Sequence, residues 1–293
     1  MKSIFQLFGI TTNFSRFIEV NDLDFPKIDP VSKSDTEICL LFLSTKKDFE
    51  TLGASITTAI ASLSNFSIRN ISLIVPDHEV DTVPNEVQLI NNLDIQAESR
   101  FITDVQKEKI ERTFGARKGW ALQQILKFAY IMESEAVGVL VVDSDTLLTS
   151  KREWLSKDRV QVLTPTWEYH QPYYNFLRLL GFDYGIPKYT FVAHHMLIQP
   201  FFYREAIAKT QIVDVNTLIE FLADHYYGNE ASPFSIDYEL YAQYVFANYP
   251  SKVRLQKWAN IHSPMSYSDY ASNNMIREQY SQKYASISFH SYS

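Results

Sequence analysis

The chain has 293 residues, of which 46% are hydrophobic and 14% aromatic, and its formal net charge is −7. A chain of this size and composition can bury a large core in one or two domains. Acidic and basic residues are interspersed, so no basic patch argues for a nucleic-acid partner. The single cysteine, Cys39, excludes an internal disulfide framework and a cysteine-based zinc cluster.

No apolar stretch reaches the roughly 20 residues that a transmembrane helix needs, and the N-terminal apolar run is too short and interrupted for a signal peptide. We therefore expect a cytoplasmic protein with no transmembrane segment. Residues 1–36, which include Pro26 and Pro30, are expected to form an irregular arm. Residues 37–293 are expected to form a single domain.

Strand and helix patterns alternate in the first half of this domain. Continuous apolar runs predict buried strands over Glu37–Leu43 and Ser67–Val75, and residues 87–95 predict a weaker strand. Between the first two, residues 49–63 carry an apolar stripe with helical spacing. The alternation predicts an α/β fold with a mixed, mostly parallel central sheet flanked by helices.

The next segment, residues 114–132, predicts a helix that starts near Gly119. One of its faces is apolar and should pack on the sheet. The positions on the other side are Trp120, Gln123, Gln124 and Lys127, and we expect the last three to face solvent. Arg117 and Lys118 place two cations at the helix N-terminus, a position that favours anions.

This helix leads into the most informative stretch of the chain, a buried apolar strand over residues 139–142 that ends in Asp143-Ser144-Asp145. In an extended chain the side chains of Asp143 and Asp145 point the same way, just outside the carboxyl end of the strand, where open α/β sheets bind ligands. Two such carboxylates suit a hard divalent ion that completes its shell with diphosphate oxygens. The alternative is a simple Asp-Ser-Asp turn that caps the strand.

Residues 191–198 predict a strand that carries His194 and His195 side by side. Neighbouring strand residues face opposite ways, so at most one of the two can line a given pocket, and the other is a core histidine. We assign His195 to the ligand-binding site.

Residues 232–241 have the composition of a helix start, with Ser232 or Ser235 as the cap and acidic residues in the first turns. Asp237 and Glu239 lie two positions apart, or about 200° around a helix, so they cannot both face the same pocket. Other elements in the second half are helices over 201–210 and 215–226, and strands over 160–164, 252–261 and 285–290. The last two strands end near His262 and His290, either of which can complete a metal site.

Four blocks in this order carry a resemblance: Arg117 to Lys127, Val-Val-Asp-Ser-Asp ending at Asp145, His-His-Met from His194, and Asp-Tyr-Glu-Leu-Tyr from Asp237. The sequence resembles nucleotide-sugar glycosyltransferases of the GT-A fold, and more narrowly a group of bacterial and viral GT-A enzymes. The resemblance covers residues 37–290. It implies a transferase that moves a sugar from a nucleotide-diphosphate sugar, most simply a UDP-sugar, to a hydroxyl of a glycan or glycoconjugate with the help of Mn²⁺ or Mg²⁺.

The resemblance also implies roles for particular residues. Asp143, Asp145 and His290, or His262 in its place, would bind the metal. Asp237 or Glu239 would act on the acceptor. The residues implied at the nucleotide and the donor sugar are Ser44, Thr45, Arg117, Trp120, Gln124, Ser144 and His195.

Two other functions compete with this hypothesis. A nucleotidyltransferase is another metal-dependent nucleotide enzyme, but the sequence has neither G-x-x-x-x-G-K-[ST] nor G-x-G-x-x-G. A non-catalytic carbohydrate-binding protein would use the Asp-Ser-Asp triplet only as a turn.

Overall fold

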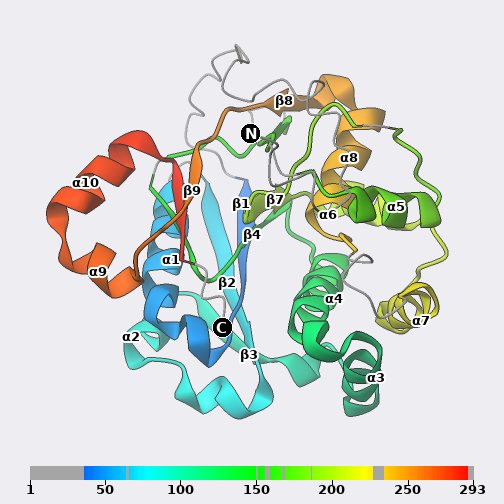
Figure 1. Cartoon of the computed structure of the whole chain (residues 1–293), viewed down its shortest axis with the longest axis horizontal. Coiled ribbons are helices and arrows are strands. Elements are labelled where there is room, and N and C mark those ends of the chain that lie inside the picture. The colour runs from blue at the N-terminus through cyan, green and yellow to red at the C-terminus, as the bar shows by residue number, and fades with distance from the viewer. Residues whose placement is uncertain are drawn as a thin grey trace, which may run out of the picture.

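The computed structural model describes residues 36–63, 66–149, 151–155, 159–166, 169–185, 187–226 and 234–289. Its centre is a five-stranded sheet in the order β3-β2-β1-β4-β7 (Figure 1). The strands are β1 (Glu37–Leu43), β2 (Ser67–Val75), β3 (Leu93–Ala97), β4 (Gly138–Val142) and β7 (His195–Ile198). The first four are parallel, and β7 runs antiparallel to β4. This confirms the predicted α/β fold with a mixed, mostly parallel sheet.

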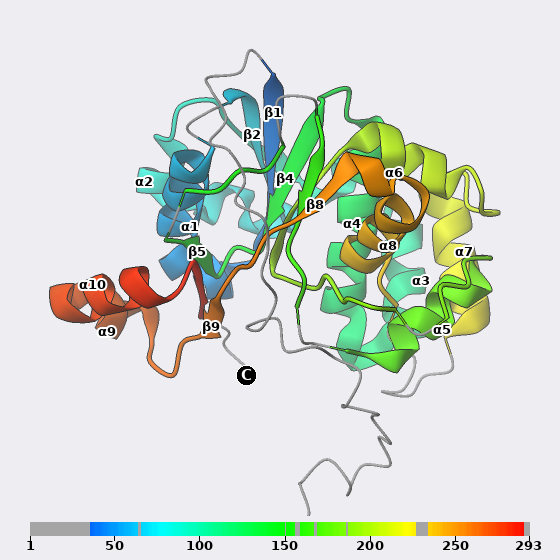
Figure 2. The same cartoon turned by 90° about the horizontal axis from the view of Figure 1, so that it is seen from above.

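Alternation along the strands sorts the core into two layers. In β1, Ile38, Leu40 and Phe42 pack with one layer, whereas Cys39 and Leu41 pack with the other. The first layer includes α1 (Phe49–Ser62) and the short α2 (Asn85–Gln88). The second layer is larger and contains α3 (Asp104–Phe114), α4 (Lys118–Glu133), α5 (Gln171–Leu179), α6 (Pro200–Ile207), α7 (Val215–His225) and α8 (Tyr238–Asn248). Figures 1 and 2 show these two sets of helices on opposite sides of the sheet.

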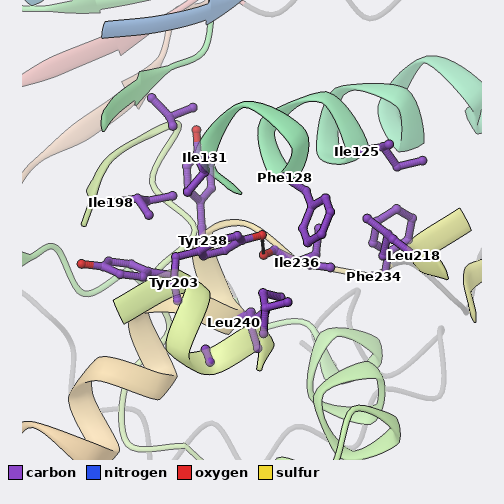
Figure 3. Close-up of a cluster of buried hydrophobic side chains, with 14 of the residues drawn as sticks. Ile125, Phe128, Ile131, Ile198, Tyr203, Leu218, Phe234, Ile236, Tyr238 and Leu240 are labelled. Atoms are coloured by element: carbon purple, nitrogen blue, oxygen red, sulfur yellow. Dashed lines mark hydrogen bonds between the residues drawn. The ribbon is translucent and has the colours of Figure 1, made fainter. Parts of the chain in front are cut away.

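Contacts within the larger core layer hold the N-terminal end of α8 in place. Figure 3 shows Phe128 and Ile131 of α4 beside Phe234, Ile236 and Tyr238 of the segment that leads into α8. The buried hydroxyl of Tyr203 donates to the carbonyl of Ile236 at 2.8 Å. Packing against α4 and α6 therefore holds the first residues of α8 against the carboxyl end of the central sheet.

Smaller elements complete the described chain. The remaining strands are β5 (Thr146–Leu148), β6 (Gln161–Leu163), β8 (Val253–Leu255), β9 (Asn260–His262) and β10 (Ser286–Ser288). They form the sheets β5-β10-β9 and β6-β8. Helices α9 (Tyr267–Ser272) and α10 (Asn274–Lys283) lie beside α1, far from α4 and α8 (Figures 1 and 2). The short 3₁₀ helices are η4 (Lys46–Asp48), η5 (Asp77–Thr82), η6 (Glu98–Arg100), η7 (Gly115–Arg117) and η8 (Pro250–Lys252).

Several predicted elements are corrected. Residues 87–95 are not one strand, because Pro84 precedes the helical turn α2 and the strand begins only at Leu93. The strand predicted over 252–261 is two strands, β8 and β9, in different sheets. The cap of α8 is Asp237, whose carboxylate accepts from the amide of Tyr238. Of the two predicted caps, Ser235 precedes the helix by three positions and Ser232 lies outside the described residues.

Helix α4 also differs from its prediction. It is buried continuously from Gln124 to Ile131, because α3, α6 and α7 cover it in addition to the sheet. The polar positions Gln124 and Lys127, which we expected in solvent, are therefore inside the protein. No helix within the described residues combines the length and apolar character required to cross a bilayer.

Candidate active site

The alternation of β4 directs Asp143 toward α4. Val139 and Val141 face the larger core layer, and Asp143 follows them in the same alternation. It meets a cavity of about 310 Å³ at the carboxyl end of the sheet. Lining residues come from η4, α4, α5, the turn after β4, the segment before β7, and the start of α8 with the residues before it. They are Lys47, Trp120, Gln123, Gln124, Lys127, Asp143, Asp145, Tyr173, Val192, His194, Ser235, Asp237 and Tyr238.

Lys127 is the charge at the centre of this site. Its Nζ lies 3.3 Å from Oδ1 of Asp143 and 3.2 Å from Oδ2 of Asp237, and it also lies within 4.6 Å of the ring centre of Tyr238. Burial lowers the pKa of Lys127, but Asp143, Tyr238 and Asp237 outweigh burial and hold the pKa well above its usual value. A permanently charged lysine thus joins two acidic residues that are 94 positions apart in the sequence.

Sequence analysis missed this role of Lys127. The apolar stripe predicts which side of α4 packs on the sheet. It does not reveal that other segments of the chain also cover the polar side of α4. The available signal was local: Lys127 is surrounded in sequence by Ile125, Leu126, Phe128 and Ala129, a long apolar run for an exposed lysine.

Asp143 has partners at both carboxylate oxygens. The hydroxyl of Tyr238 donates to Oδ1 at 3.2 Å, and Nδ1 of His194 lies 3.2 Å from Oδ2. Burial raises the pKa of Asp143, but Lys127 and His194 more than offset burial and hold it well below the usual range. Asp143 is therefore ionised at neutral pH.

The two adjacent histidines lie in different environments, and the residue at the pocket is His194. It has a left-handed backbone (φ 57°), which is uncommon for a residue other than glycine, and its carbonyl accepts from the amide of Asp143 at 2.9 Å. The assignment of His195 to the pocket is wrong. As the first residue of β7, His195 points to the other side of the sheet, is only 1% exposed, and packs against the indoles of Trp154 and Trp258.

Asp145 also lines the cavity, and the C-terminal strand reaches it. The carbonyl of Asp145 accepts from the amide of Phe289 at 2.9 Å, and the hydroxyls of Thr146 and Ser288 lie 2.9 Å apart. The next residue, the predicted ligand His290, lies outside the described residues. The alternative ligand His262 pairs in register with Ser288 and is exposed.

The residues of this site fit a hard cation by their chemistry. Asp143 and Asp145 bring two carboxylates to one cavity, and carboxylate oxygens are the ligands that Mg²⁺ and Mn²⁺ prefer. Within the ranges that the structure describes, no three His, Cys, Asp or Glu side chains are grouped closely enough to hold a metal ion on their own. A cation here would need further ligands, such as phosphate oxygens and water.

The acidic pair at the start of α8 is divided, as the helical spacing predicts. Asp237 lines the cavity and accepts from the amide of Tyr238 at 2.7 Å and from the hydroxyl of Ser235 at 3.2 Å, in addition to its contact with Lys127. Glu239 does not line it. Its carboxylate points into the protein and accepts from Tyr174, Phe191 and Gln243.

The other predicted ligand-binding residues divide in the same way. Trp120 and Gln124 line the cavity, and Oε1 of Gln124 accepts from the amide of Ile236. The remaining four do not line it. Ser44 and Thr45 follow β1 at the same edge of the sheet, Ser144 is buried and donates to Asp48, and Arg117 lies over the ring of Trp120 at 5.1 Å.

Comparisons with known proteins give structural likenesses only. No protein-family profile matches the sequence, and no curated protein sequence matches it. Among solved structures, the chain is similar to the galactosyltransferase LgtC in complex with donor and acceptor sugar analogues, at 11% identity over 87% of each chain and a TM-score of 0.48. It is similar to mouse xyloside xylosyltransferase 1 in its apo form, at 12% identity over 87% of this chain and 98% of that one, with a TM-score of 0.42.

A third similar structure is the glycosyltransferase GlyE of Streptococcus pneumoniae TIGR4, at 11% identity and a TM-score of 0.39. The likeness spans 88% of this chain and 55% of that one. At these identities the likeness concerns the arrangement of the chain alone.

Proposed function

We propose that the protein is a metal-dependent glycosyltransferase that moves a sugar from a nucleotide-diphosphate sugar to a hydroxyl of a glycan or glycoconjugate. The observation that supports this function best is the buried Lys127, whose ammonium group joins Asp143 at the end of β4 to Asp237 at the start of α8. This ion pair brings together, in one cavity, Asp143, which we expect at the donor diphosphate, and Asp237, which we expect at the acceptor.

The charges of the cavity favour a cation together with a diphosphate. Among the described lining residues, the carboxylates of Asp143, Asp145 and Asp237 are accompanied by the ammonium groups of Lys47 and Lys127, which leaves one net negative charge. A divalent ion reverses that sign, so an anionic diphosphate is then attracted to the site. Without Lys127, three carboxylates would repel one another in a partly buried space.

The walls of the cavity suit a sugar. Trp120 and Tyr173 provide aromatic surface for the C–H face of a pyranose, while the side-chain amides of Gln123 and Gln124 can donate to and accept from its hydroxyls. Asp237 is the carboxylate that α8 contributes, and we assign it to the acceptor hydroxyl, as the proton acceptor or as the group that orients it.

Asp143 and Asp145 would hold the metal, with His290 as the further protein ligand that the resemblance implies. When bound, Mn²⁺ or Mg²⁺ supplies positive charge to the departing diphosphate. Lys127 keeps Asp143 ionised and contacts Asp237 as well, so that both carboxylates are held in position before the substrates bind.

Thermal-shift measurements test this function directly. UDP-, GDP-, CMP- and TDP-sugars are each added with Mn²⁺ and with EDTA. We expect one nucleotide class to raise the melting temperature with Mn²⁺ and to lose that effect in EDTA, because a ligand that binds only the folded state stabilises it. Release of the free nucleotide from the selected donor, as a diphosphate from UDP-, GDP- and TDP-sugars or as CMP from a CMP-sugar, then separates an enzyme from a carbohydrate-binding protein. No shift with any donor would contradict the proposed function.

A further inference from the structure

Glu239 lies beside the cavity but is closed off from it. The residue is 1% exposed, and both of its carboxylate oxygens accept hydrogen bonds. Oε1 accepts from the hydroxyl of Tyr174 at 3.0 Å and from the amide of Phe191 at 2.8 Å. Oε2 accepts from the side-chain amide of Gln243 at 3.0 Å. A carboxylate enclosed in this way cannot reach a substrate in the cavity.

Two of these donors, Tyr174 and Phe191, are next in sequence to residues that line the cavity. Tyr174 of α5 follows the lining residue Tyr173. Phe191 precedes the lining residue Val192 and comes three positions before His194.

The amide of Gln243 uses its second hydrogen on the carbonyl of Tyr189, at 2.7 Å. The 189–194 segment is thus attached to α8 at two points, through Phe191 and Tyr189. It ends in the left-handed backbone of His194, a conformation that surrounding contacts must maintain.

We propose that Glu239 is a positioning residue that joins α5, the 189–194 segment and the start of α8 into one rigid wall of the cavity. This inference rests on the proposed function, because the wall carries Tyr173, Val192, His194 and Asp237 to the substrates. It changes the role of Glu239 from a candidate proton acceptor to a group that acts through other residues.

The hydrogen bonds favour the ionised form of Glu239. A carboxylate accepts all three strongly, whereas protonation of Oε2 makes it a weaker acceptor for the amide of Gln243. Burial, with a smaller contribution from the nearby Asp237, raises the pKa of Glu239 to about 7 against the opposing hydrogen bonds from Phe191, Gln243 and Tyr174. Of the groups that contact it, Tyr174 of α5 is titratable, and its pKa is raised by burial and by Glu239 itself. The rigid wall is therefore expected to form as pH rises through neutrality.

The decisive experiment measures hydrogen exchange and substrate binding on the same variants. In Glu239→Gln, the new amide faces the amide of Gln243, so we expect the exchange rate of the Phe191 amide to rise roughly tenfold to a hundredfold. The affinity for UDP with Mn²⁺ should stay within about twofold, because Glu239 touches neither Lys127 nor the two carboxylates at the end of β4. Release of UDP from UDP-glucose or UDP-galactose should fall at least tenfold, and its dependence on pH near 7 should disappear.

Gln243→Met is the second variant, in case Glu239→Gln does not fold. It removes the amide that joins Glu239 to Tyr189 and should raise exchange across 189–194 in the same direction. Exchange that is unchanged in both variants would overturn the proposal. Loss of UDP release without a change in exchange would also overturn it, since Glu239 would then act chemically. If the wild-type protein binds no nucleotide with Mn²⁺, the proposed function fails. A change in exchange as expected would then support only the structural part of the inference, namely that Glu239 makes the wall rigid.

Discussion

Two buried cations lie on opposite sides of the central sheet and have opposite surroundings. Lys127 is 6% exposed and contacts the carboxylates of Asp143 and Asp237. Arg152 is 5% exposed and lies over the rings of Trp154 at 4.4 Å and Trp258 at 4.6 Å, while its Nε and Nη1 have no hydrogen-bond partner among the residues that the structure describes. Burial lowers the pKa of Arg152 to about 9, whereas the carboxylates raise that of Lys127.

The difference shows how one sheet separates chemistry from packing. The Lys127 side has the charges, the cavity and the left-handed His194. The Arg152 side has the buried His195, whose pKa is lowered by burial and by Arg152. Within the described part of the chain, its two ring nitrogens have no hydrogen-bond partner. Counter-charges thus distinguish the two cations: Lys127 joins two carboxylates, whereas Arg152 contacts two indole rings.

The largest effect is expected from Lys127→Met, which keeps most of the length of the side chain and removes its charge. Asp143 and Asp237 would then lose the cation between them, and breaking a buried ion pair costs about 3–5 kcal/mol. Urea unfolding should show this loss, and binding of UDP with Mn²⁺ should weaken. Lys118→Met is the matched control on the same helix, because Lys118 pairs with Glu111 at an exposed position and should cost less than about 1 kcal/mol. Equal losses in the two variants would contradict a central role for Lys127.

The pH dependence of stability should reveal the titration of the buried carboxyl group of Glu239. Its pKa rises from 4.5 to about 7 on folding, so the folded state binds the proton more tightly than the unfolded state. Stability from this group is therefore present at low pH and is lost as pH rises from 4.5 through 7, by about 3 kcal/mol in total. Urea titrations between pH 5 and 8 give the free energy of unfolding at each pH. This free energy should fall with rising pH more steeply in the wild type than in Glu239→Gln. Parallel curves would show that Glu239 has an ordinary pKa.

Much of the sheet could be predicted from the sequence, because its information is local. The apolar runs of β1, β2 and β4 mark strands buried on both faces, and alternation alone places Asp143 outside the end of β4. Alternation also predicts that His194 and His195 separate. Alternation does not say which of the two histidines faces the cavity. That follows from the pairing of β7 with β4, in which His195 lies opposite Val142.

The rest of the site depends on contacts between distant segments. Lys127 and Gln124 contact Asp237 and Ile236, residues that lie more than 100 positions later in the chain. The enclosure of Glu239 likewise needs Tyr174 and Phe191, from two other segments. Helical spacing predicts that Asp237 and Glu239 diverge, but only the packing shows which of the two meets the cavity.

Arg152→Met should change stability little, in contrast to Lys127→Met. The substitution removes two contacts with indole rings, each of which stabilises a desolvated cation by about 1–2 kcal/mol, but it also removes the cost of burying an unpaired charge. These contributions oppose each other, so we expect a net change within about 1 kcal/mol in urea unfolding and unchanged binding of UDP with Mn²⁺. A loss as large as that of Lys127→Met would show that Arg152 has a counter-charge after all.

The smallest change in stability is expected from Asp145→Asn, although its effect on binding should be large. The side chain lines the cavity, and its contact with the hydroxyl of Thr146 can be kept by the amide oxygen, so unfolding should change by less than about 0.5 kcal/mol. A carboxamide is a far weaker ligand for Mn²⁺ than a carboxylate, so calorimetry should show loss of the Mn²⁺-dependent part of UDP binding. A small change in stability together with a large loss of binding would distinguish Asp145 from Asp143, because Asp143 takes part in the buried ion pair as well as lining the cavity. Unchanged UDP affinity in Asp145→Asn would remove Asp145 from the metal site and leave the triplet as a turn that ends the strand.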